Sequence, residues 1–174
     1  KIKGSVLWLR INNKLAQENI CNAAERRGID KKRIIFADKL PMEEHLARHI
    51  LADIFLDTFK FNAHTTASDA LWAGLPIVTK LGKSFSARVA GSLLTAIGMT
   101  ELITNTELEY EDLIIRLASN PDELNKIKQK LNKNKLTTPL FNTETYTIYL
   151  EKAFSKAVEN YSSRDDLMNI NIAP

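Results

Sequence analysis

Two carboxylates, a histidine and two threonines lie within one short segment of the sequence, DTFKFNAHTTASDALWAGLPIVT, at residues 57–79. Thr65 and Thr66 stand where a helix is predicted to begin, with His64 just before them and Asp69 one turn later. A helix N-terminus offers unpaired backbone N–H groups and the positive end of the helix dipole, and a threonine there is a good N-cap. An anion, phosphate above all, binds at such a place. The segment therefore predicts a phosphate-binding site.

The same residues also have a purely structural interpretation. Thr66 and Asp69 have the spacing of a capping box, which stabilises a helix start and needs no ligand. His64 could be an ordinary solvated loop histidine, and Lys83 and Arg88, further along the chain, could face either phosphate or solvent. The combination favours a ligand, because ligands of open parallel sheets bind beyond the carboxyl ends of the strands, where these groups are expected to gather.

An alternation of strands and helices must position these residues. Strands are expected at residues 6–9, 34–36, 54–56, 77–79 and 101–103. Helices are expected at residues 13–27, 41–52, 65–74, 88–97, 110–119, 121–134 and 142–161. This order predicts a Rossmann-like α/β domain at residues 1–161, with a parallel sheet, right-handed crossovers and helices on both faces. The polar remainder, residues 162–174, is expected to be a disordered tail.

The apolar pattern also predicts which sides of these elements are buried. The strand at residues 6–9 is expected to be short and buried. The helix at residues 41–52 should begin at Pro41, and its buried side should consist of Leu46, Ile50 and Leu51. The last helix should carry an apolar stripe made of Tyr146, Tyr149, Leu150, Ala153, Phe154 and Ala157.

The helix at residues 41–52 carries a second group of polar side chains. His45 and His49 are four residues apart and could share a metal, but no third ligand is apparent nearby. Alternatively, His45 or Arg48 donates hydrogen bonds to a ligand or offers a flat surface to a base. A solvated helix face with an ion pair between Glu44 and Arg48 is the structural interpretation.

Composition excludes several classes of function. The chain has 174 residues, enough for one domain with a real core, and its 44% hydrophobic and 26% charged content is that of a globular protein. A net charge of +3 gives no case for nucleic acid. The single cysteine, Cys21, excludes an internal disulfide and fits a reducing cytoplasm. No apolar run approaches the length that crosses a membrane, and the early first strand suggests a domain of a longer protein.

Three runs of the sequence carry a close resemblance to a known family: EEHLARHILADIFLDT, NAHTTASDALWAGLPIVT and SFSARVAGSLLTAIGMTELI. They resemble the C-terminal catalytic lobe of O-linked N-acetylglucosamine transferases, particularly the bacterial members linked to tetratricopeptide repeats and the SPINDLY-like proteins. The likeness runs from about Ser5 to Tyr161. It implies the nucleotide-sugar-binding lobe of a GT-B glycosyltransferase, whose terminal helix crosses back towards the other lobe. It also implies an inverting, metal-independent enzyme that moves N-acetylglucosamine from UDP-GlcNAc to serine or threonine hydroxyls of proteins.

The resemblance assigns donor-binding roles and no catalytic residue within this chain. It implies that Thr65 and Thr66 hold the diphosphate, and that His64 lies beside it and is a candidate for supporting catalysis. It also implies that Asp69 binds ribose hydroxyls. His45 and Arg48 are implied to lie next to the uracil. With no metal cofactor, helix amides and side-chain donors must stabilise the leaving diphosphate.

The chain departs from the family at one position and lacks other parts of it. Met42 stands where better-known animal members have a lysine, and it cannot donate to a nucleotide. The upstream lobe, with the proposed bases and a lysine that contacts the diphosphate, and the repeats that hold the acceptor are missing. The chain alone is therefore expected to bind a donor nucleotide and not to transfer sugar.

Three alternatives remain open at this stage. The donor could be another nucleotide sugar, such as UDP-glucose or GDP-fucose. The chain could also be a non-catalytic module that binds nucleotides or proteins. A dehydrogenase or a P-loop enzyme is disfavoured because neither G-x-G-x-x-G nor G-x-x-x-x-G-K-[ST] occurs.

Overall fold

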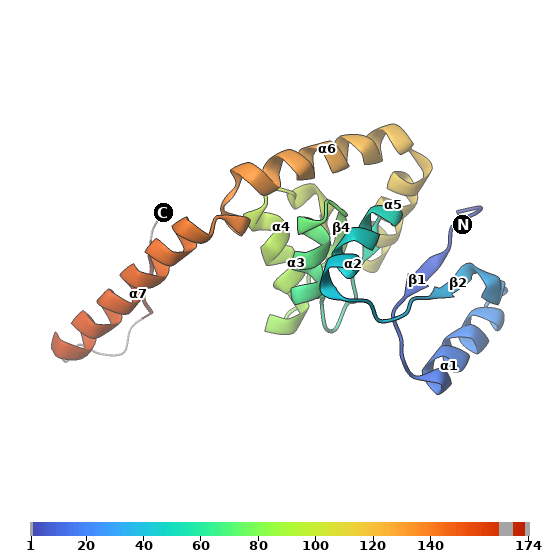
Figure 1. Cartoon of the computed structure of the whole chain (residues 1–174), viewed down its shortest axis with the longest axis horizontal. Coiled ribbons are helices and arrows are strands. Elements are labelled where there is room, and N and C mark those ends of the chain that lie inside the picture. Colours follow the sequence, from blue (N-terminus) through green and yellow to red (C-terminus); the bar gives the residue numbers. More distant parts are fainter. Residues whose placement is uncertain (1, 164–168, 173–174) are drawn as a thin grey trace.

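The computed structural model describes residues 2–163 and 169–172, and Figure 1 shows the arrangement of the elements. The strands are β1 (Leu7–Leu9), β2 (Ile34–Phe36), β3 (Phe55–Leu56), β4 (Ile77–Lys80) and β5 (Ile103–Thr104). The α-helices are α1 (Lys14–Glu25), α2 (Met42–Ala47), α3 (Thr65–Trp72), α4 (Val89–Ala96), α5 (Glu107–Ser119), α6 (Pro121–Thr137) and α7 (Thr143–Ser163). Short 3₁₀ helices include η2 (Arg48–Leu51) and η3 (Phe85–Ala87). Every strand pair is parallel, which confirms the predicted α/β class.

The strands form two separate sheets rather than the single sheet that the sequence predicted. β1 pairs with β2, and β3, β4 and β5 form a second sheet with β4 in its centre. The classical doubly wound sheet has the strand order 3-2-1-4-5-6. In that order, β2 and β1 match positions 3 and 2, and β3, β4 and β5 match positions 4, 5 and 6. Position 1, between β1 and β3, is filled by no strand of the described residues. The two parts therefore do not join.

The main core surrounds β4. Ile77, Val78 and Thr79 are all fully buried, and successive strand residues point to opposite faces, so both faces of this sheet are covered. Helices α3, α4 and α5 pack on β4, and α6 packs on α3 and α5 (Figure 1). Helices on both faces are thus confirmed for the three-stranded sheet.

Two burial predictions were wrong. No residue of the first strand is buried: Leu7 is exposed and Trp8 and Leu9 are half-buried, because the two-stranded sheet lies outside the main core. The helix predicted at residues 41–52 begins one residue late, with Pro41 as its N-cap, and tightens into η2 after Ala47. A 3₁₀ helix has fewer residues per turn and so rotates the buried face. As a result Ile50 and Leu51 are 80% and 75% exposed, while His49 is buried.

The last helix stands apart from the body of the molecule (Figure 1). Its apolar stripe is present, but none of its residues is buried, and Tyr146 and Phe154 are exposed. Ser162 and Ser163 extend α7 two residues beyond its predicted end. Residues 164–168 and 173–174 of the predicted disordered tail lie outside the described residues, so the disorder stays a prediction.

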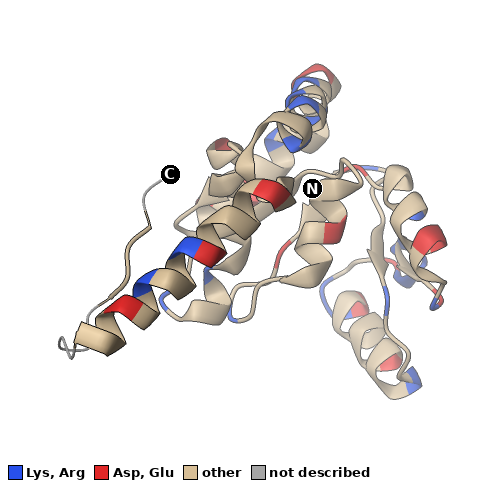
Figure 2. Ribbon diagram, turned by 60° about the vertical axis from the view of Figure 1, so that its left-hand side comes forward, with Lys and Arg blue, Asp and Glu red and all other residues tan. Residues whose placement is uncertain are grey.

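Basic residues are concentrated on α6, whereas α7 carries both signs of charge (Figure 2). Several of the α6 lysines tie the helix to the rest of the domain. Lys128 pairs with Asp53 at 3.3 Å, and Lys130 pairs with Glu101 at 2.6 Å. Lys135 donates to a backbone carbonyl at the end of α3. These three lysines therefore have structural partners and need no ligand to account for them.

One buried carboxylate fixes the loop that joins β3 to α3. Asp57 directly follows β3 and is 4% exposed. Its Oδ1 accepts the backbone N–H groups of Thr58, at 2.9 Å, and Ala63, at 2.7 Å. Its Oδ2 accepts the hydroxyl of Thr79 on β4 at 2.5 Å. The Tyr110 hydroxyl, from α5, donates to the Asp57 carbonyl at 2.9 Å. The loop is therefore held at the carboxyl ends of β3 and β4.

Opposing influences act on this carboxyl group. Burial raises the pKa of Asp57, and the hydrogen bonds from Thr79, Ala63 and Thr58 together with the charge of His64 act in the opposite direction. Burial is the larger influence, so the net pKa lies above its ordinary value.

Replacing Asp57 by alanine should lower the free energy of unfolding by about 3 kcal/mol, because three hydrogen-bond donors would lose their common acceptor. Urea denaturation followed by circular dichroism measures this. Asp53→Ala is the matched control, since the Asp53 side chain is 83% exposed and pairs only with Lys128 among the partners found in the described residues. That variant should lose at most about 1 kcal/mol. Equal losses in both variants would contradict the anchoring role of Asp57.

The stability of the domain should also depend on pH through Asp57. Because its folded pKa is raised above the unfolded value, the folded state binds the proton more tightly, and stability falls as the pH rises between the two values. Asp57→Asn cannot ionise and lacks this contribution. The unfolding free energy of the unaltered protein minus that of Asp57→Asn should therefore increase as the pH is lowered through this interval, in urea titrations at a series of pH values. If this difference in unfolding free energy decreases as the pH is lowered, the hydrogen bonds have a larger effect on the pKa of Asp57 than burial has.

Candidate functional site

Helix α3 begins at Thr65, one residue after its N-cap, His64. The His64 backbone is non-helical, with φ −106° and ψ −94°, and its carbonyl accepts the N–H groups of Ala67 and Ser68 at 3.0 and 3.1 Å. The prediction that Thr65 or Thr66 is the N-cap was therefore wrong, because His64 already closes the first turn.

The predicted capping box does not form. The N-cap of α3 makes no side-chain hydrogen bond, and Thr66 and Asp69 both lie inside the helix. The first N–H groups of a helix have no intrahelical partner. No side chain of the described residues caps this helix start, so the N–H groups of Thr65 and Thr66 remain available together with the exposed hydroxyls of the same two residues. The N–H of Ala67 is already bonded to the His64 carbonyl.

A hollow of about 450 Å³ opens beside this helix start. The residues that line it come from β3, the following loop and the first turn of α3: Phe55, Leu56, Asp57, Thr58, Phe61, Asn62, Ala63, His64, Thr65 and Thr66. The structure thus brings together four of the polar residues singled out in the sequence, namely Asp57, His64, Thr65 and Thr66. They lie at the carboxyl ends of parallel strands, where ligands of such sheets bind.

His64 is held by groups that the sequence did not indicate. Its ring stacks on Phe61, with centroids 4.7 Å apart and planes 14° apart, and meets the edge of Phe85 at 6.2 Å. Its Nε2 lies 3.5 Å from the carbonyl oxygen of Ser86. That carbonyl also accepts the backbone N–H of Asn62 at 2.8 Å. The loop before α4 therefore packs against His64 and Asn62, which line the hollow. The sequence signal that could have indicated these contacts is the presence of an aromatic residue, Phe61 or Phe85, in each of two otherwise polar loops.

The second group of predicted residues gathers around His45. Arg48 Nη2 lies 2.7 Å from His45 Nδ1, and Arg48 Nη1 donates to the carbonyl of Asp38 at 2.8 Å. A guanidinium only donates, so Nδ1 is the acceptor and the proton of a neutral His45 sits on Nε2. The guanidinium also lies 5.7 Å from the ring centroid of Trp8 on β1, so η2 contacts the two-stranded sheet. These contacts replace the predicted ion pair with Glu44.

The surroundings of His45 keep its imidazole neutral. Burial lowers the pKa of His45, and the charges of Arg48 and His49 lower it further. The carboxylate of Asp69 acts in the opposite direction, which shows that α2 and α3 bring His45 and Asp69 near each other. At neutral pH His45 therefore presents a neutral N–H donor, and Asp69 is close enough for its charge to act on the ring.

Other candidate sites have weaker support. His49 Nδ1 donates to the His45 carbonyl at 2.8 Å, and the described residues contain no group of three His, Cys, Asp or Glu side chains placed to hold a metal. Arg88 donates to the carbonyl of Gly82 at 3.2 Å and so closes its own loop, while Lys83 is exposed.

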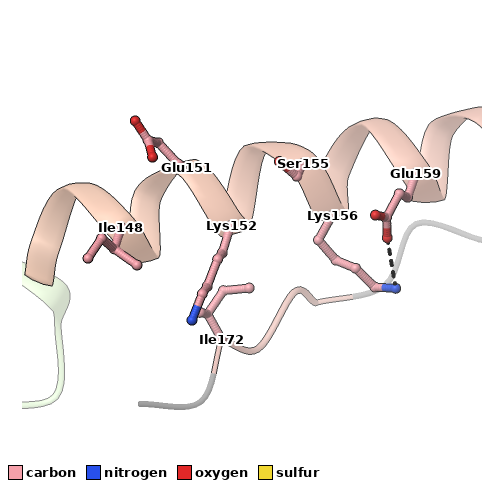
Figure 3. Close-up of a pocket in the computed structure, with 7 residues that line it drawn as sticks. All are labelled: Ile148, Glu151, Lys152, Ser155, Lys156, Glu159 and Ile172. Carbon is pink, nitrogen blue, oxygen red and sulfur yellow. Dashed lines mark hydrogen bonds and ion pairs between the residues drawn. The ribbon is translucent and has the colours of Figure 1, made fainter.

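A second hollow, of about 550 Å³, runs along α7 far from these residues. Figure 3 shows Ile172 and Lys152 close together there, with Glu151 pointing away and Lys156 paired with Glu159. None of the residues singled out in the sequence lines it. In the described part of the chain, no helix has the length and apolar character that a membrane span requires.

Comparisons with known proteins identify the family of this chain. The family model of Glycosyl transferase family 41 matches residues 1–150. A probable UDP-N-acetylglucosamine--peptide N-acetylglucosaminyltransferase SEC of Arabidopsis thaliana is 36% identical over 157 residues, covering 90% of this chain and 16% of that protein. The UDP-N-acetylglucosamine--peptide N-acetylglucosaminyltransferase of Caenorhabditis elegans is 36% identical over 159 residues, covering 91% and 14%.

A comparison with solved structures also finds an O-GlcNAc transferase. A mutant of the Thermobaculum terrenum O-GlcNAc transferase matches with a TM-score of 0.77 and 28% identity, over 83% of this chain and 28% of that one. The chain thus spans a small part of the length of its relatives. Because the family model covers most of the chain and the strand-end site is in place, the chain belongs to glycosyl transferase family 41.

Proposed function

We propose that this chain binds the nucleotide sugar UDP-GlcNAc as the donor-binding lobe of a cytoplasmic, inverting protein O-GlcNAc transferase. The observation that carries the proposal is the open first turn of α3, which presents amides and two threonine hydroxyls beside a hollow at the strand ends. The names of the relatives, which describe transfer of N-acetylglucosamine to peptides, support the choice of donor and acceptor.

The diphosphate is assigned to the start of α3. Thr65 and Thr66 offer two hydroxyl donors, and the first-turn amides and the helix dipole favour negative charge at the same place. His64 lies at the N-cap and contributes a further nitrogen close by. Hydrogen bonds to a charged group are worth about 1.5–3 kcal/mol each, so a few of them give useful affinity. These donors also stabilise the charge that develops on the leaving diphosphate, the task that a metal ion performs in other transferases.

The nucleoside is assigned to the group around His45. His45 offers an N–H donor, Arg48 is fixed against it by a 2.7 Å contact, and Asp69 supplies carboxylate acceptors for two ribose hydroxyls. Asp69 lies one helical turn after the threonines, so ribose and diphosphate can be bound by one helix at once. The neutral state of His45 suits an uncharged base.

Transfer itself requires groups from outside this chain. The proposed roles here are binding and stabilisation of the leaving group, and no residue is assigned as the catalytic base. We assign the base and the acceptor site to an N-terminal lobe and to tetratricopeptide repeats of the same polypeptide. The small share of the relatives that this chain spans, 16% and 14% in two of them, supports this division.

A titration of the chain with UDP and with GDP, followed by amide NMR, tests the proposal. UDP should shift the resonances of Thr65 to Asp69 and of the residues around His45, and GDP should shift them less, because the larger base must fit the space beside His45. Shifts with GDP alone would mean that the donor is a GDP-linked sugar and not UDP-GlcNAc. Absence of shifts at α3 with either nucleotide would contradict a donor site in this chain.

Two variants should separate the base from the diphosphate. His45→Ala should weaken binding of UDP by about tenfold, the loss of one buried hydrogen bond, and leave binding of pyrophosphate unchanged. Thr66→Val keeps the shape of the side chain and removes its hydroxyl, so it should weaken UDP and pyrophosphate alike. Isothermal titration calorimetry with both ligands measures the two patterns. Equal losses of UDP and pyrophosphate in His45→Ala would refute the assignment of the base.

A further inference from the structure

One strand position lies between β1 and β3 and is filled by no strand of the described residues; we call it the central position. In the strand order 3-2-1-4-5-6, each number also gives the place of a strand along the chain, and the central position is number 1. The strand that belongs there therefore precedes β1. Only residues 1–6 precede β1 in this chain. They are too few, because a parallel strand needs a connection of about a dozen residues or more to reach its neighbour.

β3 presents one backbone edge to the central position. The N–H of Phe55 donates to the carbonyl of Pro76 at 2.8 Å, and the N–H of Asp57 donates to the carbonyl of Val78 at 3.1 Å, so both residues face β4. Successive residues of a strand direct their backbone groups to alternate edges of the strand. The N–H and C=O groups of Leu56 therefore point to the central position.

β1 presents a second edge. The carbonyl of Leu9 accepts the N–H of Ala37 at 2.7 Å, so Leu9 faces β2, and the N–H and C=O groups of Trp8 point the other way. The contact between the Trp8 ring and Arg48, on the turn just before β3, places β1 on the side of the three-stranded sheet. Figure 1 shows β1 and β2 together at one side of the helices that surround β4. A strand edge of this kind is a row of donors and acceptors ready to pair with a further strand.

The side chains next to the central position are apolar and exposed. Every residue of β1 is apolar, as is typical of a parallel strand covered on both faces, yet Leu7 is 40% exposed and Val6 before it is 59% exposed. Leu56 on β3 is 42% exposed. By contrast, Ile77 and Val78 of β4, which has a neighbouring strand on each side, are fully buried. The apolar residues of β1 and β3 are therefore less covered than their composition predicts.

These features specify the segment that fits the central position. It is an extended apolar run of about five residues, because both of its faces would be covered and a charge there would lie unpaired between Leu7 and Leu56. A helix in a right-handed crossover follows it, because β1 is its next parallel neighbour. That helix would cover apolar side chains that β1 exposes.

We infer that a segment of the polypeptide upstream of Lys1 forms this strand, pairs in parallel with Trp8 of β1 and Leu56 of β3, and joins the two sheets into one. The relatives support a longer polypeptide, since this chain covers 16% and 14% of two of them. The inference goes beyond the proposed function and takes from it only that the polypeptide continues upstream. It does not depend on nucleotide binding.

Hydrogen–deuterium exchange followed by mass spectrometry tests the inference on this chain and on the full-length polypeptide. The amides of Trp8 and Leu56 should exchange fast in this chain and at least about tenfold more slowly in the full-length polypeptide, because they become part of a hydrogen-bonded ladder. Phe36 is the matched control amide. It faces the outer edge of β2, since its neighbour Ala37 faces β1, and its exchange should be the same in both.

A variant of the full-length polypeptide checks that both edges bind the same strand. Leu7→Asp places a charge against the inserted strand, so the Leu56 amide, which belongs to the other sheet, should exchange about tenfold faster and approach its rate in this chain. Leu15→Asp is the control variant, because Leu15 is 64% exposed and lies on α1 rather than on a strand. It should leave the Leu56 amide protected.

Three results would overturn the inference. The first is fast exchange of both amides in the full-length polypeptide, and the second is a gene that encodes no apolar strand before Lys1. The third is slow exchange in this chain alone, because the edges would then be covered without the upstream segment; a dimer in sedimentation velocity would identify a second copy as the cover. The UDP titration is unaffected by all of these results, so the nucleotide site can stand while the inserted strand fails.

Discussion

The arrangement of the site depends on the buried carboxylate of Asp57. A chain leaving a parallel strand has many ways to reach the next helix, and here a single side chain selects one of them. Asp57 binds the two ends of its own loop, through Thr58 and Ala63, and the neighbouring strand, through Thr79. Because the loop is pinned at both ends, the residue that follows it, His64, becomes the N-cap of α3. The open first turn of the helix is thereby placed at the strand ends.

The same constraint places the groups with which our proposal binds a diphosphate without a metal ion. The first turn of α3 provides its charge complementarity through backbone amides, whose positions are set by the fold and do not change with pH. His45, which binds the other end of the nucleotide in our proposal, is kept neutral by burial and by Arg48 and His49. The two ends of the site thus use different physical means, a helix dipole for the charged group and neutral hydrogen bonding for the base.

The two-stranded sheet also takes part in positioning the candidate site. Arg48, on η2, links α2 to this sheet, since its guanidinium contacts His45 at 2.7 Å and also lies over Trp8 on β1. The position of the proposed nucleoside residues therefore depends on a contact with the two-stranded sheet, whereas the position of the proposed diphosphate residues depends on the interior of the three-stranded sheet. We expect the diphosphate end of the site to be the more rigid of the two.

The sequence by itself determined the class of the fold and the order of its elements. The alternation of short apolar runs with helical patterns is a local property, and the strands at residues 34–36 and 77–80 appear where it predicts them. Resemblance to a family assigned roles to the polar residues of the candidate site, and these roles stay predictions.

Tertiary structure decided how those residues meet. The N-cap fell on His64 because Asp57 fixes the loop, and His49 rather than Ile50 is buried because α2 tightens into η2. The proximity of His45 and Asp69 and the stacking of Phe61 on His64 join residues whose contacts the linear pattern does not specify. Propensity and periodicity act over one or two turns of chain, whereas these contacts arise from the packing of separate elements, so only the folded structure could fix them.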